Sequence, residues 1–129
     1  MKRVQYSSDY QKSRAYAPAV VTEGGRTIWL AGILADADEE GHSLAGDFAG
    51  QVRCIYRRMA RQLEAAGASL DHVVTMTGYI TDVRYNLDFV EVRKEFFRED
   101  SYPSSTLVTI QALNRPDSLV EITAIAVAP

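Results

Sequence analysis

The sequence predicts an α+β fold in which a mixed sheet carries two helices on one face. Segments rich in β-branched residues alternate with two amphipathic segments of helical spacing, and short polar turns separate several of the strands. Because both helices and tight turns connect the strands, we expect two layers, helices on a mixed sheet. A chain of 129 residues has the usual length of one domain, so we expect a single domain over residues 1–129.

The first strands are predicted on either side of a glycine pair. Segments 20–22 and 27–31 flank Gly24 and Gly25, and glycine tolerates the positive φ that a tight hairpin requires. We therefore expect these two segments to form a β-hairpin. A further short strand is predicted over residues 2–6.

The first helix is predicted from a stripe of apolar residues that Gly67 ends. The stripe recurs at intervals of three and four and consists of Phe48, Val52, Ile55, Met59, Leu63 and Ala66. Off the stripe lie Arg53, Arg57, Arg58 and Arg61. We interpret these arginines as a solvated outer face, with a basic patch for an acidic partner as the alternative. Cys54 is interpreted as a packed thiol rather than a nucleophile, because no histidine lies near it in sequence.

Three further strands and a second helix complete the predicted fold. The strands cover residues 73–81, 106–112 and 119–128. The helix lies between the first two of them, with Tyr85, Phe89, Val92 and Phe96 at helical spacing. The last strand is apolar on both faces, and two layers leave one of these faces uncovered. Self-association is therefore predicted.

Composition argues against several classes of function. Fourteen Lys and Arg against seventeen Asp and Glu give a net charge of −3, the wrong sign for a nucleic-acid partner. The two histidines lie far apart and the single cysteine has no ligand near it, so we expect no metal site. The acidic segment 35–43 is interpreted as a surface loop. No apolar run resembles a signal peptide or a membrane span, so we expect a cytoplasmic protein without a membrane partner.

Glu121 is the most conspicuous candidate for chemistry. A carboxylate among Val120, Ile122 and other apolar residues of a strand is costly unless it is hydrogen-bonded, and a desolvated carboxylic acid can exchange protons with a substrate or water. The equal alternative is that Glu121 lies at a wet subunit edge or pairs with an arginine across a subunit interface. Tyr16 before the first hairpin, and the hydroxyls of Ser105 and Thr106, are weaker candidates with simple packing or turn roles as alternatives.

The order of several short motifs resembles the RidA/YjgF (Rid) family along almost the whole chain. These motifs are Leu30-Ala31-Gly32, Glu64-Ala65-Ala66-Gly67, Asp71-His72-Val73-Val74, Thr81-Asp82, Phe96-Phe97, Tyr102-Pro103 and Val120-Glu121-Ile122. The resemblance implies a chorismate-mutase-like fold and a homotrimer whose sheets close a central β-barrel, with ligand clefts between subunits. It also implies hydrolysis of reactive enamines and imines, such as 2-aminoacrylate, to 2-keto acids and ammonia without a metal or organic cofactor.

The resemblance implies a role for particular residues of this chain. Glu121 matches the acidic residue that orients the attacking water, Tyr16 the tyrosine that closes the cleft, and Gly32 a glycine that steadies the substrate. Family positions for arginine, serine, asparagine and cysteine are matched by Ser105, Ala31, Val90 and Leu107.

These four differences from the family pattern predict a cleft with fewer polar groups. With Ser105 and Thr106 supplying only neutral hydrogen bonds, we expect a more apolar or uncharged enamine or imine than 2-aminoacrylate as substrate. Arg115 in a following turn is the alternative anchor.

Two classes of function are therefore predicted for the cleft. The first is a Rid-like hydrolase in which Glu121 activates a water. The second is a catalytically silent trimer that binds a small metabolite as a regulatory or sequestering protein. A ribonuclease activity, sometimes attached to the family, has little support, because the chain is acidic and lacks a basic stripe with stacking aromatic residues.

Overall fold

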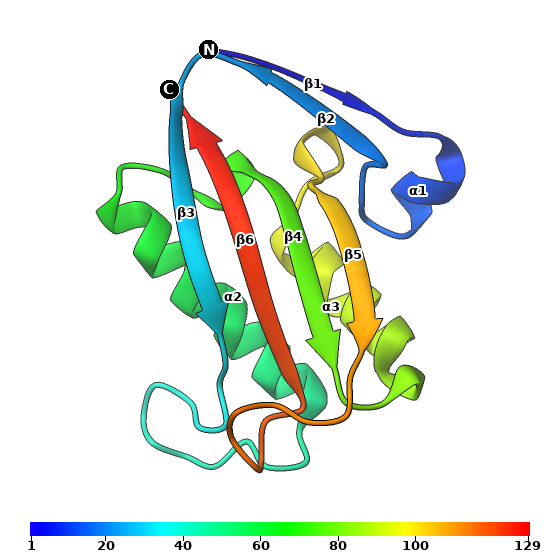
Figure 1. Cartoon of the computed structure of the whole chain (residues 1–129), viewed down its shortest axis with the longest axis vertical. Coiled ribbons are helices and arrows are strands. Elements are labelled where there is room, and N and C mark those ends of the chain that lie inside the picture. The colour runs from blue at the N-terminus through cyan, green and yellow to red at the C-terminus, as the bar shows by residue number, and fades with distance from the viewer.

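A computed structural model describes residues 1–129 as a four-stranded sheet, two long helices and a separate pair of N-terminal strands (Figure 1). Along the chain the elements are β1 (Lys2–Tyr6), α1 (Asp9–Ser13), β2 (Ala19–Glu23), β3 (Arg26–Ile33), α2 (Phe48–Ala65), β4 (Val73–Ile80), α3 (Asn86–Phe96), β5 (Ser104–Thr109) and β6 (Val120–Ala128). The short helix α1 was not predicted from the sequence.

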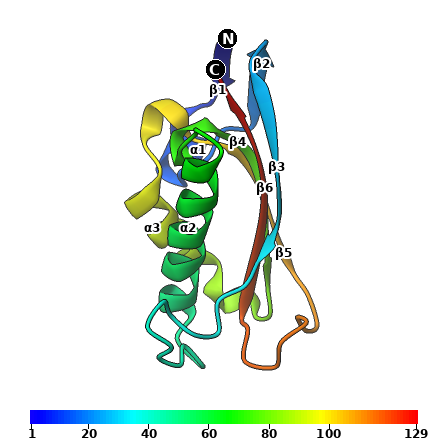
Figure 2. The same ribbon diagram turned by 90° about the vertical axis from the view of Figure 1, so that its left-hand side faces the viewer.

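The main sheet is mixed and has helices on one face only. Its strand order is β3-β6-β4-β5; β4 and β5 run parallel, whereas β6 is antiparallel to both of its neighbours. Helix α3 connects the two parallel strands, as such a connection requires. Figure 2 shows α2 and α3 in one layer and the sheet in the other. The predicted two-layer arrangement is confirmed.

The predicted hairpin of residues 20–22 and 27–31 is wrong. Gly24 and Gly25 do have positive φ angles, 73° and 84°, but the turn that they form joins two different sheets. Strand β2 pairs with β1, while β3 pairs along β6. The reason is that β3 finds a longer partner in the central strand, which buries the apolar side chains of both against α2.

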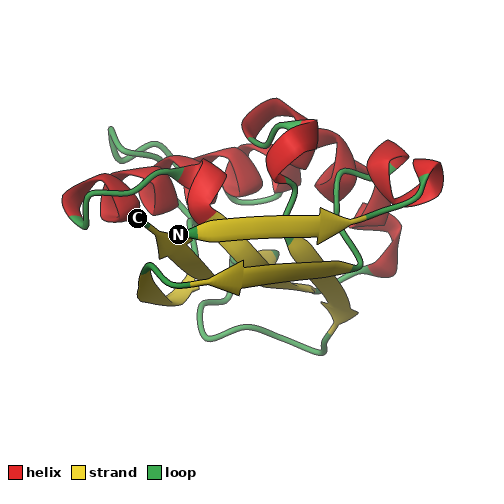
Figure 3. Cartoon of the chain, turned by 90° about the horizontal axis from the view of Figure 1, so that it is seen from above, coloured by secondary structure: helices red, strands yellow, loops and turns green.

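The N-terminal strand pair is attached to the remainder of the chain through Arg3. Its guanidinium group donates hydrogen bonds to the carbonyl oxygens of Asp71 at 2.8 Å and Ser101 at 3.0 Å. Seen from above, β1 and β2 lie beside the main sheet rather than within it (Figure 3). This unit includes α1 and leads to Tyr16, so its attachment decides where that side chain lies.

Helix α2 follows its predicted stripe closely. The Asp47 side chain accepts a hydrogen bond from the Gly50 amide at the N-terminus, and Gly67 has a positive φ of 76° just beyond the C-terminus. The stripe residues Val52, Ile55, Met59 and Leu63 are fully buried. No helix in the structure is long and apolar enough to cross a membrane.

Strand β6 separates its two faces as the alternation predicted. Val120, Ile122, Ala124 and Ala126 are buried against the helices. Glu121, Thr123 and Ile125 lie half-buried on the other face, which no helix covers. On the same open face Trp29 of β3 is 75% exposed, opposite Ile125. The uncovered apolar face that the sequence predicted is therefore present.

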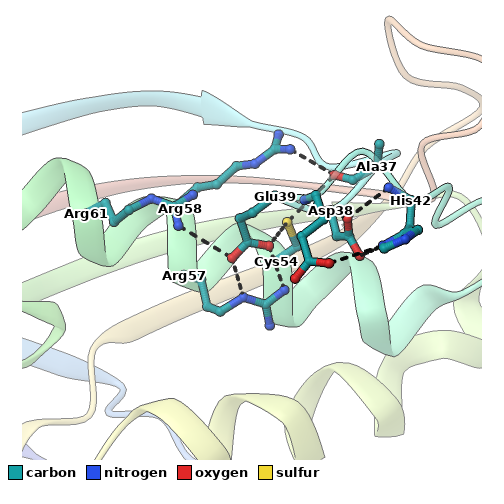
Figure 4. Close-up of polar contacts among 9 residues, drawn as sticks. Ala37, Asp38, Glu39, His42, Cys54, Arg57, Arg58 and Arg61 are labelled. Atoms are coloured by element: carbon teal, nitrogen blue, oxygen red, sulfur yellow. Dashed lines mark hydrogen bonds and ion pairs between the residues drawn. The ribbon is translucent and has the colours of Figure 1, made fainter.

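The basic face of α2 is exposed to solvent, as predicted, but its arginines are not free, because they hold the acidic loop of residues 35–43 (Figure 4). Arg57 donates to both oxygens of Glu39, at 2.7 and 2.9 Å, and Arg61 lies 3.4 Å from the same carboxylate. Arg58 donates to the carbonyl oxygens of Leu34 and Ala37. Because these cations are engaged within the chain, the structure does not support a basic patch for an acidic partner.

Cys54 is a packed thiol, as predicted. Its Sγ is fully buried at 3.4 Å from Oε1 of Glu39 (Figure 4). Burial, and then the hydrogen bond to Glu39, raise the pKa of the Cys54 thiol, which favours the inert protonated form.

Gln51 is the most connected buried polar side chain of the core. Its Nε2 donates to the carbonyl oxygens of Leu44 and Asp117, both at 2.9 Å, and its Oε1 accepts from the Leu119 amide at 2.8 Å. The carboxamide thus ties the start of α2 to the loops on either side, including the loop of residues 110–119 that leads into β6.

The Glu39 contacts predict a pH-dependent stability. The hydrogen bond from Arg57 holds the pKa of Glu39 well below its ordinary range. Since this carboxyl has a lower pKa folded than unfolded, its stabilising effect is complete above the ordinary value of about 4.3 and is lost as the pH falls through the folded pKa. Glu39→Gln should therefore lower the Tm at pH 7, and the difference from wild type should narrow below about pH 4.

The measurement is thermal unfolding followed by circular dichroism across this pH range. The exposed neighbour Glu40 provides a control of equal charge change, Glu40→Gln. An equal and pH-independent effect of both substitutions would show that the Glu39 contacts do not stabilise the fold.

The Gln51 contacts predict a large loss of stability on substitution. Gln51→Leu leaves two carbonyl groups and one amide without their partner, so the free energy of unfolding should fall by about 3 kcal/mol. Urea unfolding measures this change. Gln62→Leu on the exposed side of the same helix should change it by less than about 0.5 kcal/mol. Equal effects of the two substitutions would contradict the role of the buried carboxamide.

Candidate functional site

Gly32 and Glu121 are brought together by an irregularity in β3. Leu30 pairs with Ala124 and Ile33 with Ile122, so three steps along β3 match two along β6. Such a bulge re-aims the strand locally and is common beside active sites. It places Gly32 against the Glu121 side chain: a Cβ atom at position 32 would collide with Oε2 and lie 2.9 Å from Cδ. Only glycine leaves the carboxylate in this place.

The Glu121 side chain lines a hollow on the uncovered face of the sheet. The hollow has a volume of about 430 Å³. It is lined by Gly32, Tyr79, Ile110, Ala112, Leu113, Asn114, Glu121 and Thr123. Four of these eight residues are apolar, and they surround a small set of polar groups, which is the usual composition of a small-molecule site. We call it the Glu121 hollow.

Glu121 is half-buried, and its carboxylate has no hydrogen-bonding or ionic partner within the chain. No arginine of the same chain pairs with it, and the pair across a subunit interface stays a prediction. The neighbouring Thr123 hydroxyl donates to the Leu30 carbonyl at 3.1 Å and is not available to the carboxylate. Both lone-pair-bearing oxygens of Glu121 are thus free to accept a proton or to hold a water molecule.

The loop of residues 110–119 forms one wall of the hollow. Ile110 is hydrogen-bonded to the Ile80 carbonyl at 2.8 Å, and Gln51 holds the other end of the loop. Arg115 points elsewhere: its Nε donates to Asp36 at 2.7 Å and it does not line the hollow. The Arg115 alternative for an anchoring cation is therefore not borne out.

Tyr16 and Ser105 form a second group, away from Glu121. Both lie next to Arg93 of α3, whose Nη1 donates to Oγ of Ser105 at 2.6 Å and whose guanidinium lies 5.9 Å from the centre of the Tyr16 ring. Ser105 pairs in register with Met76, which faces the helices, whereas Glu121 pairs with Tyr79 on the open face. Within one chain the predicted site residues therefore fall into two groups.

The other predicted site residues are placed as follows. Ala31 is exposed within the bulge, next to Gly32. Thr106 is exposed on β5, on the same face as Glu121. Val90 is buried in α3, and Leu107 is half-buried against the core. None of these four lines the Glu121 hollow.

Three residues near the two groups, Arg93, Tyr79 and Asn114, were not predicted from the sequence. Arg93 lies four residues after Phe89, on the buried side of α3. A charged residue at this spacing on an apolar stripe is unusual, and this pattern could have identified Arg93 from the sequence. No sequence pattern identifies Asn114 or Tyr79. These two residues line the same hollow only because the loop between β5 and β6 returns over the sheet. No cluster of three or more His, Cys, Asp or Glu side chains is arranged to hold a metal ion.

Comparison with known sequences identifies one family over nearly the whole chain. The family model described as Endoribonuclease L-PSP matches residues 7–128. The RutC family protein PH0854 of Pyrococcus horikoshii is 32% identical over 127 residues, which cover 98% of each chain.

Solved structures share the fold. A Rid-family protein of unknown function, YyfB from Yersinia pestis, has a TM-score of 0.86 at 22% identity and covers 98% of this chain and 99% of its own. Escherichia coli TdcF, solved with bound serine, has a TM-score of 0.72 at 30% identity, with 88% of each chain covered. The family match, the relatives and the shared α+β fold agree, and the chain belongs to the RidA/YjgF/L-PSP (Rid) family.

Proposed function

We propose that this protein is a hydrolase of enamines or imines in which Glu121 activates the attacking water. The observation that carries the proposal is the partner-free carboxylate of Glu121 beside Gly32, facing a hollow of small-molecule size. A carboxylate with free lone pairs at the wall of a partly apolar hollow is suited to general acid–base work. The usual activity of the Rid family agrees with this assignment.

The reaction needs only water and proton transfers. An enamine first tautomerises to its imine. Glu121 accepts a proton from a water molecule as the water oxygen bonds to the imine carbon, and the proton then passes to the nitrogen. The hydroxyl proton of the resulting carbinolamine then passes through Glu121 to the nitrogen as the carbon–nitrogen bond breaks, which releases ammonia and leaves a carbonyl compound. Tyr16 is proposed to close the cleft, while the Gly32 and Leu107 amides steady the substrate.

We further propose that the working site lies between copies of this chain in a homotrimer. Glu121 and Gly32 lie at the β3–β6 side of the sheet, while Tyr16 and Ser105 lie by β5 at the other edge. A head-to-tail interface that brings the β5 edge of one copy beside the β3 edge of the next unites the two groups and closes a ring. The uncovered apolar face around Trp29 supports such an assembly.

A silent metabolite-binding protein is the second candidate. The TdcF structure at 30% identity contains bound serine, which favours small-molecule binding by this chain as well. The two candidates differ in whether Glu121 turns a ligand over or only contacts it. An RNA-cleaving function has less support, because Arg57, Arg58 and Arg61 are engaged with the loop of residues 35–43.

Glu121→Gln is expected to lower kcat by about 100-fold or more, because the amide cannot accept the proton of the attacking water. Gly32→Ala is expected to lower kcat as well, since its Cβ displaces the carboxylate. An amino-acid oxidase generates imines, semicarbazide traps them, and hydrolysis appears as competition with the trap. Imines of varied side chain, and uncharged imines added directly, cover the substrate range.

Glu64→Gln, which neutralises an exposed carboxylate near the end of α2, is the matched control and should retain full activity. Unchanged turnover in Glu121→Gln would exclude the mechanism. Absence of turnover in the wild type with every imine, together with ligand binding in the cleft, would establish the silent binder instead.

The trimer predicts that a charge at position 29 disrupts assembly. Trp29→Asp places a carboxylate on the open face. Because Trp29 is exposed in the single chain, the substitution should lower the stability of the fold only slightly. Sedimentation equilibrium should show a trimer for the wild type and a smaller species for the variant. Leu87→Asp, at a 62% exposed site on α3, is the control and should remain trimeric. A monomeric wild type would contradict the assembly.

A further inference from the structure

The loop of residues 110–119 is held by hydrogen bonds mainly at its two ends. Its first residue, Ile110, is bonded to the end of β4, and Gln51 of α2 binds its last residues. Between these ends, residues 111–114 make no hydrogen bond within the chain. A loop segment without such bonds is mobile unless another contact holds it.

The same segment forms a wall of the Glu121 hollow. Ala112, Leu113 and Asn114 are three of the eight residues that line the hollow. The Asn114 carboxamide has no partner within the chain, so its donor and acceptor groups are free to contact a ligand. The shape and the polarity of the hollow therefore depend on where this short segment lies.

One ion pair is the only hydrogen-bonded or ionic contact between residues 111–116 and the chain outside the loop. Nε of Arg115 donates to Oδ2 of Asp36 at 2.7 Å. This hydrogen bond lowers the pKa of Asp36, so the carboxylate is charged at neutral pH. Figure 1 shows the two loops, residues 34–47 and 110–119, at the same end of the sheet.

Asp36 is a fixed point for this contact. Its backbone carbonyl accepts from the Leu44 amide at 2.8 Å. Arg58 of α2 donates to the carbonyl oxygens of Leu34 and Ala37, which flank Asp36 in the chain. The ion pair therefore joins a segment without hydrogen bonds of its own to a segment that α2 holds in place.

The ion pair acts on the loop rather than on the fold as a whole. The Arg115 side chain is 60% exposed, and ion pairs at the surface contribute little to global stability because water and salt screen the charges. Loss of one such contact can still release a loop locally. Glu121 and Gly32 lie on β6 and β3, whose pairing does not involve this loop.

We propose that Asp36 and Arg115 are positioning residues of the site, whose ion pair holds residues 112–114 in place as the wall of the Glu121 hollow that contacts the ligand. The inference rests on the proposed function, because it concerns the hollow in which Glu121 acts. It assigns ligand affinity to the loop and proton transfer to the strands.

The first test measures the mobility of the loop in the intact protein by ¹⁵N relaxation. Arg115→Met removes the charge and the donors while keeping a side chain of similar length. Order parameters of the 112–114 amides should be about 0.85 in the wild type and fall below about 0.6 in the variant. Asp36→Ala should have the same effect. The double variant should be no more mobile than either single variant, because both substitutions remove the same contact.

The second test separates ligand affinity from chemistry. The substrate is the imine that the wild type hydrolyses fastest in the semicarbazide assay. Arg115→Met should raise KM by about fivefold or more and change kcat by less than about twofold, because the strands that carry Glu121 are unaffected. A residue that only supports the fold would instead lower the Tm without this separation of KM from kcat.

Arg84→Met is the matched control. Arg84 pairs with Asp82 at 2.6 Å in a turn that does not line the hollow, and its substitution removes the same charge from an exposed ion pair. It should leave both the order parameters of the 112–114 amides and KM unchanged.

The inference is overturned if the 112–114 amides stay rigid in Arg115→Met and Asp36→Ala, or if the loop becomes mobile while KM stays the same. These outcomes are distinct from failure of the hydrolase. Glu121-dependent turnover with a loop that stays rigid in both variants would keep the hydrolase and remove the role of the ion pair. A loop that loosens in both variants of a protein without turnover would keep the positioning role and refute only the hydrolase.

Discussion

The alternation of side chains along β6 is the constraint on which the rest of the structure depends. Its buried residues form the centre of the core, so the strand cannot shift by one residue without exposing all of them. The same alternation directs Glu121 to the opposite face, where no helix covers the sheet. Burial of one face therefore fixes the position of the carboxylate on the other. The bulge at Gly32 then provides the space beside it.

Much of the fold could be predicted from the sequence because its signals are local. The α2 stripe, the Gly67 end and the two-faced pattern of β6 each lie within one segment. The pairing of β2 and β3 could not be predicted in this way. The Gly24-Gly25 turn has the expected backbone, but pairing is decided by competition among strands far apart in sequence, and β6 is the longer partner for β3.

The site was predictable to the extent that single residues were unusual in their surroundings. Glu121 stood out among apolar neighbours, and the structure places Gly32 against it. Arg93 was overlooked because the α3 pattern was interpreted from its apolar members alone. The arginines of α2 are exposed, as predicted, but their contacts could not be predicted, because the pattern within the helix does not show that the loop of residues 35–43 returns to it.

The attachment of the N-terminal unit through Arg3 has a consequence for how such proteins diversify. The segment that carries Tyr16 belongs to a two-stranded sheet of its own, whereas Glu121 belongs to the central strand of the core. Changes in the length or sequence of that unit can reshape the cover over Arg93 without altering the register that holds the carboxylate. In the proposed function, the residue that closes the cleft and the residue that activates the water thus belong to structurally separable units, and natural selection can adjust one while the other stays constant.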